Sequence, residues 1–324
     1  IGVLAKVGVS LFSIGKADAA VRALEEGLNV AERIGGPPSL MCPLPGLPLS
    51  AILYERNELE RAEELLDRHL GNATDWGFVD KFVTGYVTQS KILLLHGEED
   101  EALQVLDEGM AIALDRDLER LRLAIVAEKL RAMVVGRTVS LTTVRQFARS
   151  AGIPSKRDEV VPKGPRTMLD EIRALCWIRV AMRNDELADA EYVAKNWRVF
   201  CDSHGAHMSS VRWTILKAEI QFLSGDTRSA QRTLRDALSI AAPIGAVRSF
   251  LDEGAVVRTL VEGCCSVDSG AVHGTDKFVL QVLGAYGGAV RESADEEKLV
   301  MYDKLTEREL EVLNQVSSGL RNRE

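Results

Sequence analysis

The chain has 324 residues, 46% hydrophobic and 27% charged, so it is long enough for about two average domains or one repeat array and is not disordered throughout. Only 5% of the residues are aromatic, and the abundance of alanine and leucine favours closely packed helices over a β-sandwich. The net charge of −8 argues against a free-standing nucleic-acid-binding protein, which normally carries a basic face.

A short motif recurs along most of the chain: a turn residue is followed five positions later by an alanine. The five clear copies are Gly15…Ala20, Asn57…Ala62, Gly97…Ala102, Asp185…Ala190 and Gly225…Ala230. A weaker copy starts at Gly136 and has Leu141 in place of the alanine. The six turn residues are spaced 39 to 49 residues apart, and each one separates two stretches with helical periodicity. This regularity predicts an array of helix pairs.

The positions around each turn are small or apolar. Four residues after the alanine, four copies carry a leucine: Leu24, Leu66, Leu106 and Leu234. Three residues further, small residues stand at Gly27, Gly109 and Ala237, with His69 and Trp197 as exceptions. Seven residues before the turn stand Gly8, Ser50, Ser90 and Ala218, with Ile178 as the exception. Small residues at these spacings share a helix face and let the paired helices approach closely.

This pattern resembles the tetratricopeptide repeat, in which a small residue, a turn and an alanine have the same relative spacing. The period of about 40 is longer than the 34 residues of that family. The resemblance implies an all-α fold, a right-handed superhelix of helix pairs over residues 1–250, in which neighbouring pairs bury each other's apolar faces.

Two segments interrupt the repeat. Residues 151–165 contain three prolines and two glycines, and residues 35–48 are also rich in both. We interpret both as long connections between pairs, with a gate or partner-binding loop at 151–165 as the alternative. The repeat fades from Val256 onward. Residues 251–301 are predicted to hold a closing helix near 276–286 and a linker.

The final segment, residues 302–324, carries the most specific motif. It reads Leu-Thr-Glu-Arg-Glu-Leu-Glu-Val-Leu from Leu305, and Thr306 with Glu309 predicts a capping box that starts a helix. Gly319 would end that helix, and Gly-Leu-Arg-Asn-Arg-Glu closes the chain. This closely resembles the start of the LuxR-type helix-turn-helix domain. The recognition helix of that domain is absent from the chain, so we expect DNA binding only through the full-length protein.

A superhelix that leads into such a motif resembles the MalT-like, ATP-dependent transcriptional regulators of the LuxR family. The resemblance implies a non-catalytic regulatory domain that senses an effector or binds a protein partner and couples this to a C-terminal DNA-binding domain. It also implies a signal-transduction ATPase of the STAND class upstream of Ile1, since no phosphate-binding loop occurs here. The alternative is a generic peptide-binding scaffold unrelated to transcription.

No metal or cofactor site and no catalytic site is expected. Cys201, His204 and His207 supply three zinc-ligand types, but the sequence places no fourth ligand nearby. The five cysteines follow no disulfide spacing, which indicates a reducing cytoplasmic setting. No signal peptide and no run of about 18 apolar residues is present, so no membrane contact is expected.

Residues at equivalent positions of the first helices should line one inner wall. Six residues before each turn the row reads Val9, Ala51, Lys91, Leu130, Arg179 and Glu219. Three residues before the turn lies a mostly apolar row that includes Tyr54 and Phe222, which we interpret as core more readily than as binding surface. We predict that Lys91, Arg179 and Glu219, above Tyr54 and Phe222, bind a small polar effector or a protein partner. These charges are expected to be exposed, so that their replacement would barely change stability. Self-association of the chain stays open.

Overall fold

The computed structural model describes residues 1–35, 39–73, 78–136, 139–264 and 275–287. By its internal contacts the chain divides into a unit of residues 1–282 and a unit of residues 283–324, and only 283–287 of the second are described. The motif at 305–324 therefore lies outside the described residues, as do residues 265–274 and 288–301 of the predicted segment 251–301. Every regular element among the described residues is a helix.

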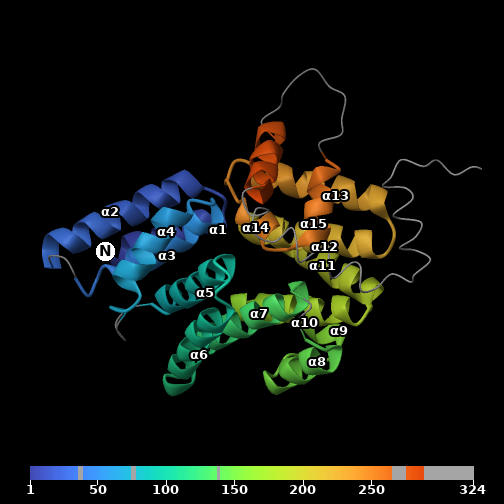
Figure 1. Cartoon of the computed structure of the whole chain (residues 1–324), viewed down its shortest axis with the longest axis horizontal. Coiled ribbons are helices and arrows are strands. Elements are labelled where there is room, and N and C mark those ends of the chain that lie inside the picture. The colour runs from blue at the N-terminus through green and yellow to red at the C-terminus, as the bar shows by residue number, and fades with distance from the viewer. Residues whose placement is uncertain (36–38, 74–77, 137–138, 265–274, 288–324) are drawn as a thin grey trace, which may run out of the picture. The chain divides into compact units, whose positions relative to one another are not determined.

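The helices form a series of pairs (Figure 1). Their bounds, in chain order, are α1 Gly2–Ser13, α2 Ala17–Gly35, α3 Pro43–Glu55, α4 Leu59–His69, α5 Asp80–Leu95, α6 Glu99–Asp115, α7 Glu119–Val135, α8 Leu141–Ser150, α9 Arg157–Val160, α10 Met168–Arg183, α11 Leu187–Ser203, α12 His207–Leu223, α13 Thr227–Ala241, α14 Arg248–Leu251 and α15 Ala255–Glu262. Residues 275–287 form one further helix. The predicted fold class, an all-α superhelix of tetratricopeptide-like pairs, is confirmed.

The predicted turn residues join the two helices of a pair. All five have a positive φ angle, which glycine adopts freely and which asparagine and aspartate tolerate better than most residues: Gly15, Asn57, Gly97, Asp185 and Gly225. The second helix of each of these pairs begins two residues later. The alanine of the motif therefore always falls on the same helix face, and all five copies are at most 1% exposed.

Close helix contact explains the small residues of the motif. A Cβ atom added to Gly8 would lie 2.5 Å from Cγ of Leu24, the leucine four residues after the motif alanine on the paired helix. The exception at His69 is compensated on α3, because a Cβ atom on Gly46 would lie 2.5 Å from the imidazole Cδ2. The large side chain of His69 in this small-residue position is therefore accommodated by a glycine opposite it.

Replacing Gly109 by alanine should destabilise the protein by about 1–3 kcal/mol, because the new methyl group would overpack the contact between α6 and its neighbours. Its Cβ atom would lie 2.9 Å from Cδ1 of Ile125 and 2.9 Å from Cγ of Tyr86. Gly284→Ala is the matched helical control, since its Cβ atom would meet nothing within 4 Å. Urea unfolding followed by circular dichroism measures both. A Gly109 variant as stable as the control would contradict this reading of the small positions.

The fourth pair departs from the predicted register. Gly136 has φ −70° and is the C-cap of α7, one residue earlier than the turn residue of the other pairs. Helix α8 starts only at Leu141, and its fourth residue is the fully buried Val144. Val144, and not Leu141, thus occupies the alanine position. The alignment on Gly136, which does not adopt a positive φ angle, therefore placed the first-helix row one residue too early and the alanine position three residues too early.

The break predicted over residues 35–48 is wrong in its second half. Helix α3 begins at Pro43 and includes Pro45 and Pro48. The first backbone N–H groups of a helix have no partner within it, so prolines in the first turn cost little. Pro48 lies deeper and removes one helical hydrogen bond. Burial of every residue from Cys42 to Ser50 offsets that loss.

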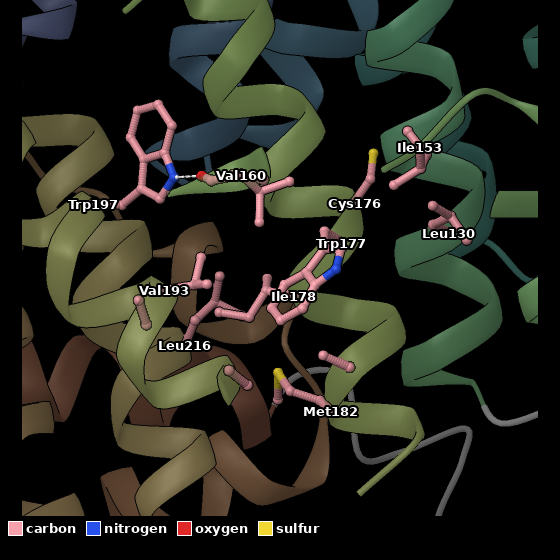
Figure 2. Packing of buried hydrophobic residues seen from close by; sticks show 14 of the residues in the cluster. Leu130, Ile153, Val160, Cys176, Trp177, Ile178, Met182, Val193, Trp197 and Leu216 are labelled. Carbon is pink, nitrogen blue, oxygen red and sulfur yellow. Dashed lines mark hydrogen bonds between the residues drawn. The ribbon is translucent and has the colours of Figure 1, made fainter. Parts of the chain in front are cut away.

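The segment 151–165 is anchored in the protein core rather than extended into solvent (Figure 2). It contains the short helix α9, and its apolar side chains Ile153, Val160 and Val161 are buried. The indole Nε1 of Trp197 donates a hydrogen bond to the carbonyl oxygen of Val160 at 2.7 Å. Trp197 in turn stacks on Trp213, with ring centroids 5.6 Å apart. These contacts are those of a structural connection between two pairs.

The array ends with the short helices α14 and α15. Phe250 of α14 is fully buried and contacts Phe278 edge to face. Val257, Leu260 and Val261 of α15 are also buried, and α15 packs on α12 and α13. The repeat thus gives way to a tightly packed turn at residues 248–253, which we call the closing turn.

Candidate functional site

The first helices of successive pairs carry one row of equivalent positions. Counted from the C-cap of each first helix, the position five residues earlier holds Val9, Ala51, Lys91, Arg131, Arg179 and Glu219. This corrects the predicted row, in which Leu130 stood in place of Arg131. Leu130 is fully buried in the hydrophobic core. Three successive first helices, α5, α7 and α10, therefore contribute Lys91, Arg131 and Arg179, which we call the basic row.

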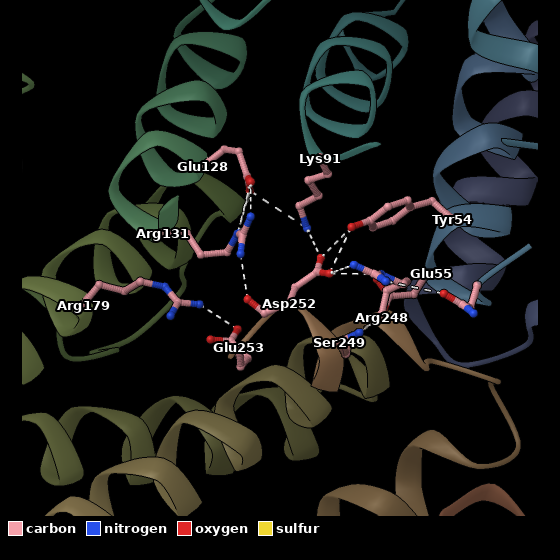
Figure 3. A network of polar contacts seen from close by, with 11 residues as sticks. Tyr54, Glu55, Lys91, Glu128, Arg131, Arg179, Arg248, Ser249, Asp252 and Glu253 are labelled. Carbon is pink, nitrogen blue, oxygen red and sulfur yellow. Dashed lines mark hydrogen bonds and ion pairs between the residues drawn. The ribbon is translucent and has the colours of Figure 1, made fainter. Parts of the chain in front are cut away.

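The basic row binds the closing turn of the same chain (Figure 3). The Asp252 carboxylate accepts a hydrogen bond from Nζ of Lys91 at 3.0 Å and from the Tyr54 hydroxyl at 3.0 Å. Nη1 of Arg131 donates to the backbone carbonyl oxygen of Asp252 at 2.7 Å. The neighbouring Glu253 carboxylate accepts from Nη2 of Arg179 at 2.7 Å. Two adjacent acidic residues thus bind side chains from α3, α5, α7 and α10, three of them through their carboxylates and Arg131 through a backbone carbonyl.

Further contacts surround this pair of carboxylates. Arg131 also donates from Nε to both oxygens of Glu128 at 3.1 Å, and Lys91 lies 4.0 Å from the same carboxylate. Nε of Arg248 binds Asp252 at 3.0 Å from within the closing turn. We call the whole set the charged cluster: Tyr54, Lys91, Glu128, Arg131, Arg179, Arg248, Asp252 and Glu253.

A second contact lies beside the charged cluster. The backbone N–H of Ser249 donates to Oε1 of Glu55 at 2.7 Å, and the Ser249 hydroxyl binds the same oxygen. Glu55 is the last residue of α3. The closing turn is therefore held to α3 through side chains and through its own backbone.

Neighbouring charges stabilise the ionised forms of the buried carboxylates and of Arg179. Burial alone would raise the pKa of the Asp252 carboxyl, but Lys91, Arg248 and Arg131 lower it well below its usual range. Burial would likewise raise the pKa of Glu128, and Arg131 and Lys91 bring it below its ordinary value. Burial alone would lower the pKa of Arg179. Glu253 and Glu219 raise it by more than burial lowers it, so the net shift is upward. The cluster is thus a set of buried or partly buried ions, each paired with at least one ion of opposite charge.

The structure brings together three of the five predicted site residues, Tyr54, Lys91 and Arg179. Glu219 is half-buried and acts on Arg179 electrostatically. Phe222 is half-buried near the end of α12 and is not a member of the charged cluster. The expected exposure of the charges is wrong, because the side chain of Arg179 is 8% exposed and that of Lys91 20%.

Sequence reasoning missed Arg131, Glu128 and the closing turn. Arg131 was within reach, because counting from the end of α7 rather than from Gly136 places it in the row. Asp252 and Glu253 gave no signal, since an adjacent acidic pair is common on solvated surfaces and lies far along the chain from Lys91. Only the three-dimensional path of the chain brings them to the basic row.

The described residues contain no group of three or more histidine, cysteine, aspartate or glutamate side chains placed to bind a metal ion. Cys201 is buried among apolar side chains, and burial raises the pKa of its thiol to about 12, which disfavours the thiolate that a metal requires. Nδ1 of His204 lies 2.7 Å from the carbonyl oxygen of Phe200. None of the helices over the described residues has the length and apolar character that crossing a bilayer requires.

A protein-family model matches most of the chain. The family described as "MalT-like TPR region" matches residues 6–263, a range that contains helices α2 to α15 and all of α1 except its start. It also contains the whole charged cluster and the closing turn. No curated protein matches the chain.

Proposed function

The chain belongs to the family of MalT-like TPR regions, and on this premise we propose that it is the regulatory domain of a LuxR-family transcriptional regulator. In this role the helix pairs form a non-catalytic platform that binds an effector or a protein partner and transmits the event to a DNA-binding domain. The observation that carries the proposal is the basic row, which places three cations from successive helix pairs around two carboxylates.

The chemistry of this site is binding chemistry. The cations of the basic row are engaged by carboxylates. Burial alone would lower the pKa of Arg131, but Glu128 and Asp252 hold it above its ordinary value. A general acid or base needs a pKa near the working pH, and Arg131 is far from it. A row of fixed positive charges is suited to recognising an anionic group, with each hydrogen bond to a charged partner contributing about 1.5–3 kcal/mol.

The link to transcription rests on the motif at 305–324, which we propose to be the first helix of a LuxR-type helix-turn-helix. The proposal also includes an ATPase module that precedes the helix pairs in the parent protein. The gene sequence tests both parts. The reading frame after Glu324 should encode a second, recognition helix, and the frame before Ile1 a phosphate-binding loop. A frame without a recognition helix would favour the alternative, a peptide-binding scaffold unrelated to transcription.

Replacing Lys91 by methionine in the full-length regulator should change its response to inducing conditions about ten- to a hundredfold, since one charge-assisted hydrogen bond of the basic row is lost. The readout is transcription from a reporter gene with and without induction. Lys195→Met is the matched control, because this exposed lysine lies on α11, a second helix outside the row. Equal responses of both variants and the unmodified protein would refute a regulatory role of the basic row.

A further inference from the structure

The closing turn has two faces of different character. Its apolar residue Phe250 is fully buried and contacts Phe278, and α14 and α15 pack on α12. Its polar residues Ser249, Asp252 and Glu253 bind side chains of α3, α5 and α10. The turn is thus fastened to the end of the array by apolar contacts and to the earlier pairs by hydrogen bonds and ion pairs.

This division determines how the contact can separate. If the earlier pairs move away from α12–α15, the closing turn can remain on α12 with Phe250 still buried. The hydrogen bonds and ion pairs of Asp252, Glu253 and Ser249 would break. Water or another ligand can replace each of these interactions. Buried ion pairs contribute little net stability compared with their strength in isolation, because desolvation opposes them. The polar contact between the closing turn and the earlier pairs can therefore be replaced by another polar ligand, whereas an apolar contact could not.

Separation would leave the basic row with an excess of positive charge. Without Asp252 and Glu253, Lys91, Arg131 and Arg179 would face the single carboxylate of Glu128 on these three helices. In the open form water takes the place of the lost carboxylates, and a replacement anion would form the same charge-assisted hydrogen bonds with the basic row. The replacement must match what it displaces: two carboxylates on adjacent residues of a peptide.

We propose that the closing turn is a built-in ligand of the basic row, and that the open row binds an acidic peptide segment with two adjacent carboxylates. The two ligands compete, so binding of the external peptide opens the closure between the closing turn and α3–α10. The inference deepens the proposed function by assigning a partner class to its binding surface. A tethered competitor acts at an effective concentration in about the millimolar range, which makes the closed form the resting state.

The test uses a fluorescent peptide with the sequence of residues 248–254, Arg-Ser-Phe-Leu-Asp-Glu-Gly, and measures its binding to the full chain by anisotropy. The same peptide with Asn-Gln in place of Asp-Glu is the control ligand. We expect weak binding to the unmodified chain. Binding to Ser249→Ala should be about tenfold tighter, because loss of this hydroxyl weakens the closure from the side of the closing turn and leaves the basic row that the peptide contacts unchanged.

The double variant Asp252→Asn/Glu253→Gln should bind the peptide more tightly still, and adding Arg179→Met to it should reverse the gain. If the double variant does not fold, as judged by circular dichroism, Ser249→Ala alone decides the question. Folded variants that bind no better than the unmodified chain, or equal binding of both peptides, would overturn the proposal. The assay involves no DNA, so its failure leaves the regulatory role intact, and a missing recognition helix in the gene leaves peptide binding intact.

Discussion

Replacing Arg131 by methionine is expected to lower the free energy of unfolding by about 3–5 kcal/mol, the cost of breaking a buried ion pair by removing one partner. Arg131 binds both oxygens of Glu128 and the carbonyl oxygen of Asp252. The Glu128 side chain is 5% exposed, so its carboxylate has no access to water that would compensate for the lost guanidinium. Urea unfolding at neutral pH measures the change.

Two further variants show whether charge pairing is the cause. Lys129→Met removes a cation from the same helix, but its partner Asp107 is 70% exposed, so the loss should stay within about 1 kcal/mol. Adding Glu128→Leu to Arg131→Met should recover part of the stability, because no uncompensated carboxylate remains. A single Arg131 variant that loses no more than Lys129→Met would contradict the assigned role of the charged cluster.

Acidification from pH 7 to pH 5 should lower the free energy of unfolding by about 2 kcal/mol through one residue, His69. Burial lowers the pKa of His69 to about 4 from its ordinary value of 6.5, with a smaller contribution from Arg68. Within the described structure its Nε2 atom is buried without a hydrogen-bond partner. Below pH 6.5 His69 therefore binds a proton in the unfolded chain, whereas in the folded protein it stays neutral until about pH 4.

The direction of the effect follows from this difference. Since the unfolded state binds more protons, stability rises with pH across the window, is complete above pH 6.5 and is lost as the pH falls toward 4. The lowered pKa values of Asp252, Glu128 and Glu253 act at more acidic pH, so measurements above pH 5 isolate the histidine. His69→Leu is the control and should remove most of the slope. A slope unchanged in that variant would assign the pH dependence to other groups.

Local patterns in the sequence predicted the helix pairs because each pair is built from contacts close along the chain. The turn at Gly97, the alanine at Ala102 and the leucine at Leu106 act within ten residues of one another. Their chemistry is enough to place one helix against the next. Errors arose where one rule was outweighed by another. Burial of the apolar side chains of α3 outweighs the helix-breaking effect of its prolines. In the fourth pair Gly136 is the C-cap and not the turn residue, so counting from it placed the first-helix row one residue too early.

The sequence by itself therefore determined the repeat, the all-α fold and the row that holds Lys91 and Arg179, since a fixed period brings equivalent positions to one surface. What only the tertiary structure decided is the ligand of that row. Asp252 lies 161 residues from Lys91 and 198 from Tyr54, and no local periodicity connects them. Their meeting depends on the accumulated rotation of every intervening helix pair, which side-chain packing sets pair by pair. The same packing buries Lys91 and Arg179, which were expected to be exposed to solvent, and pairs them with carboxylates of the closing turn.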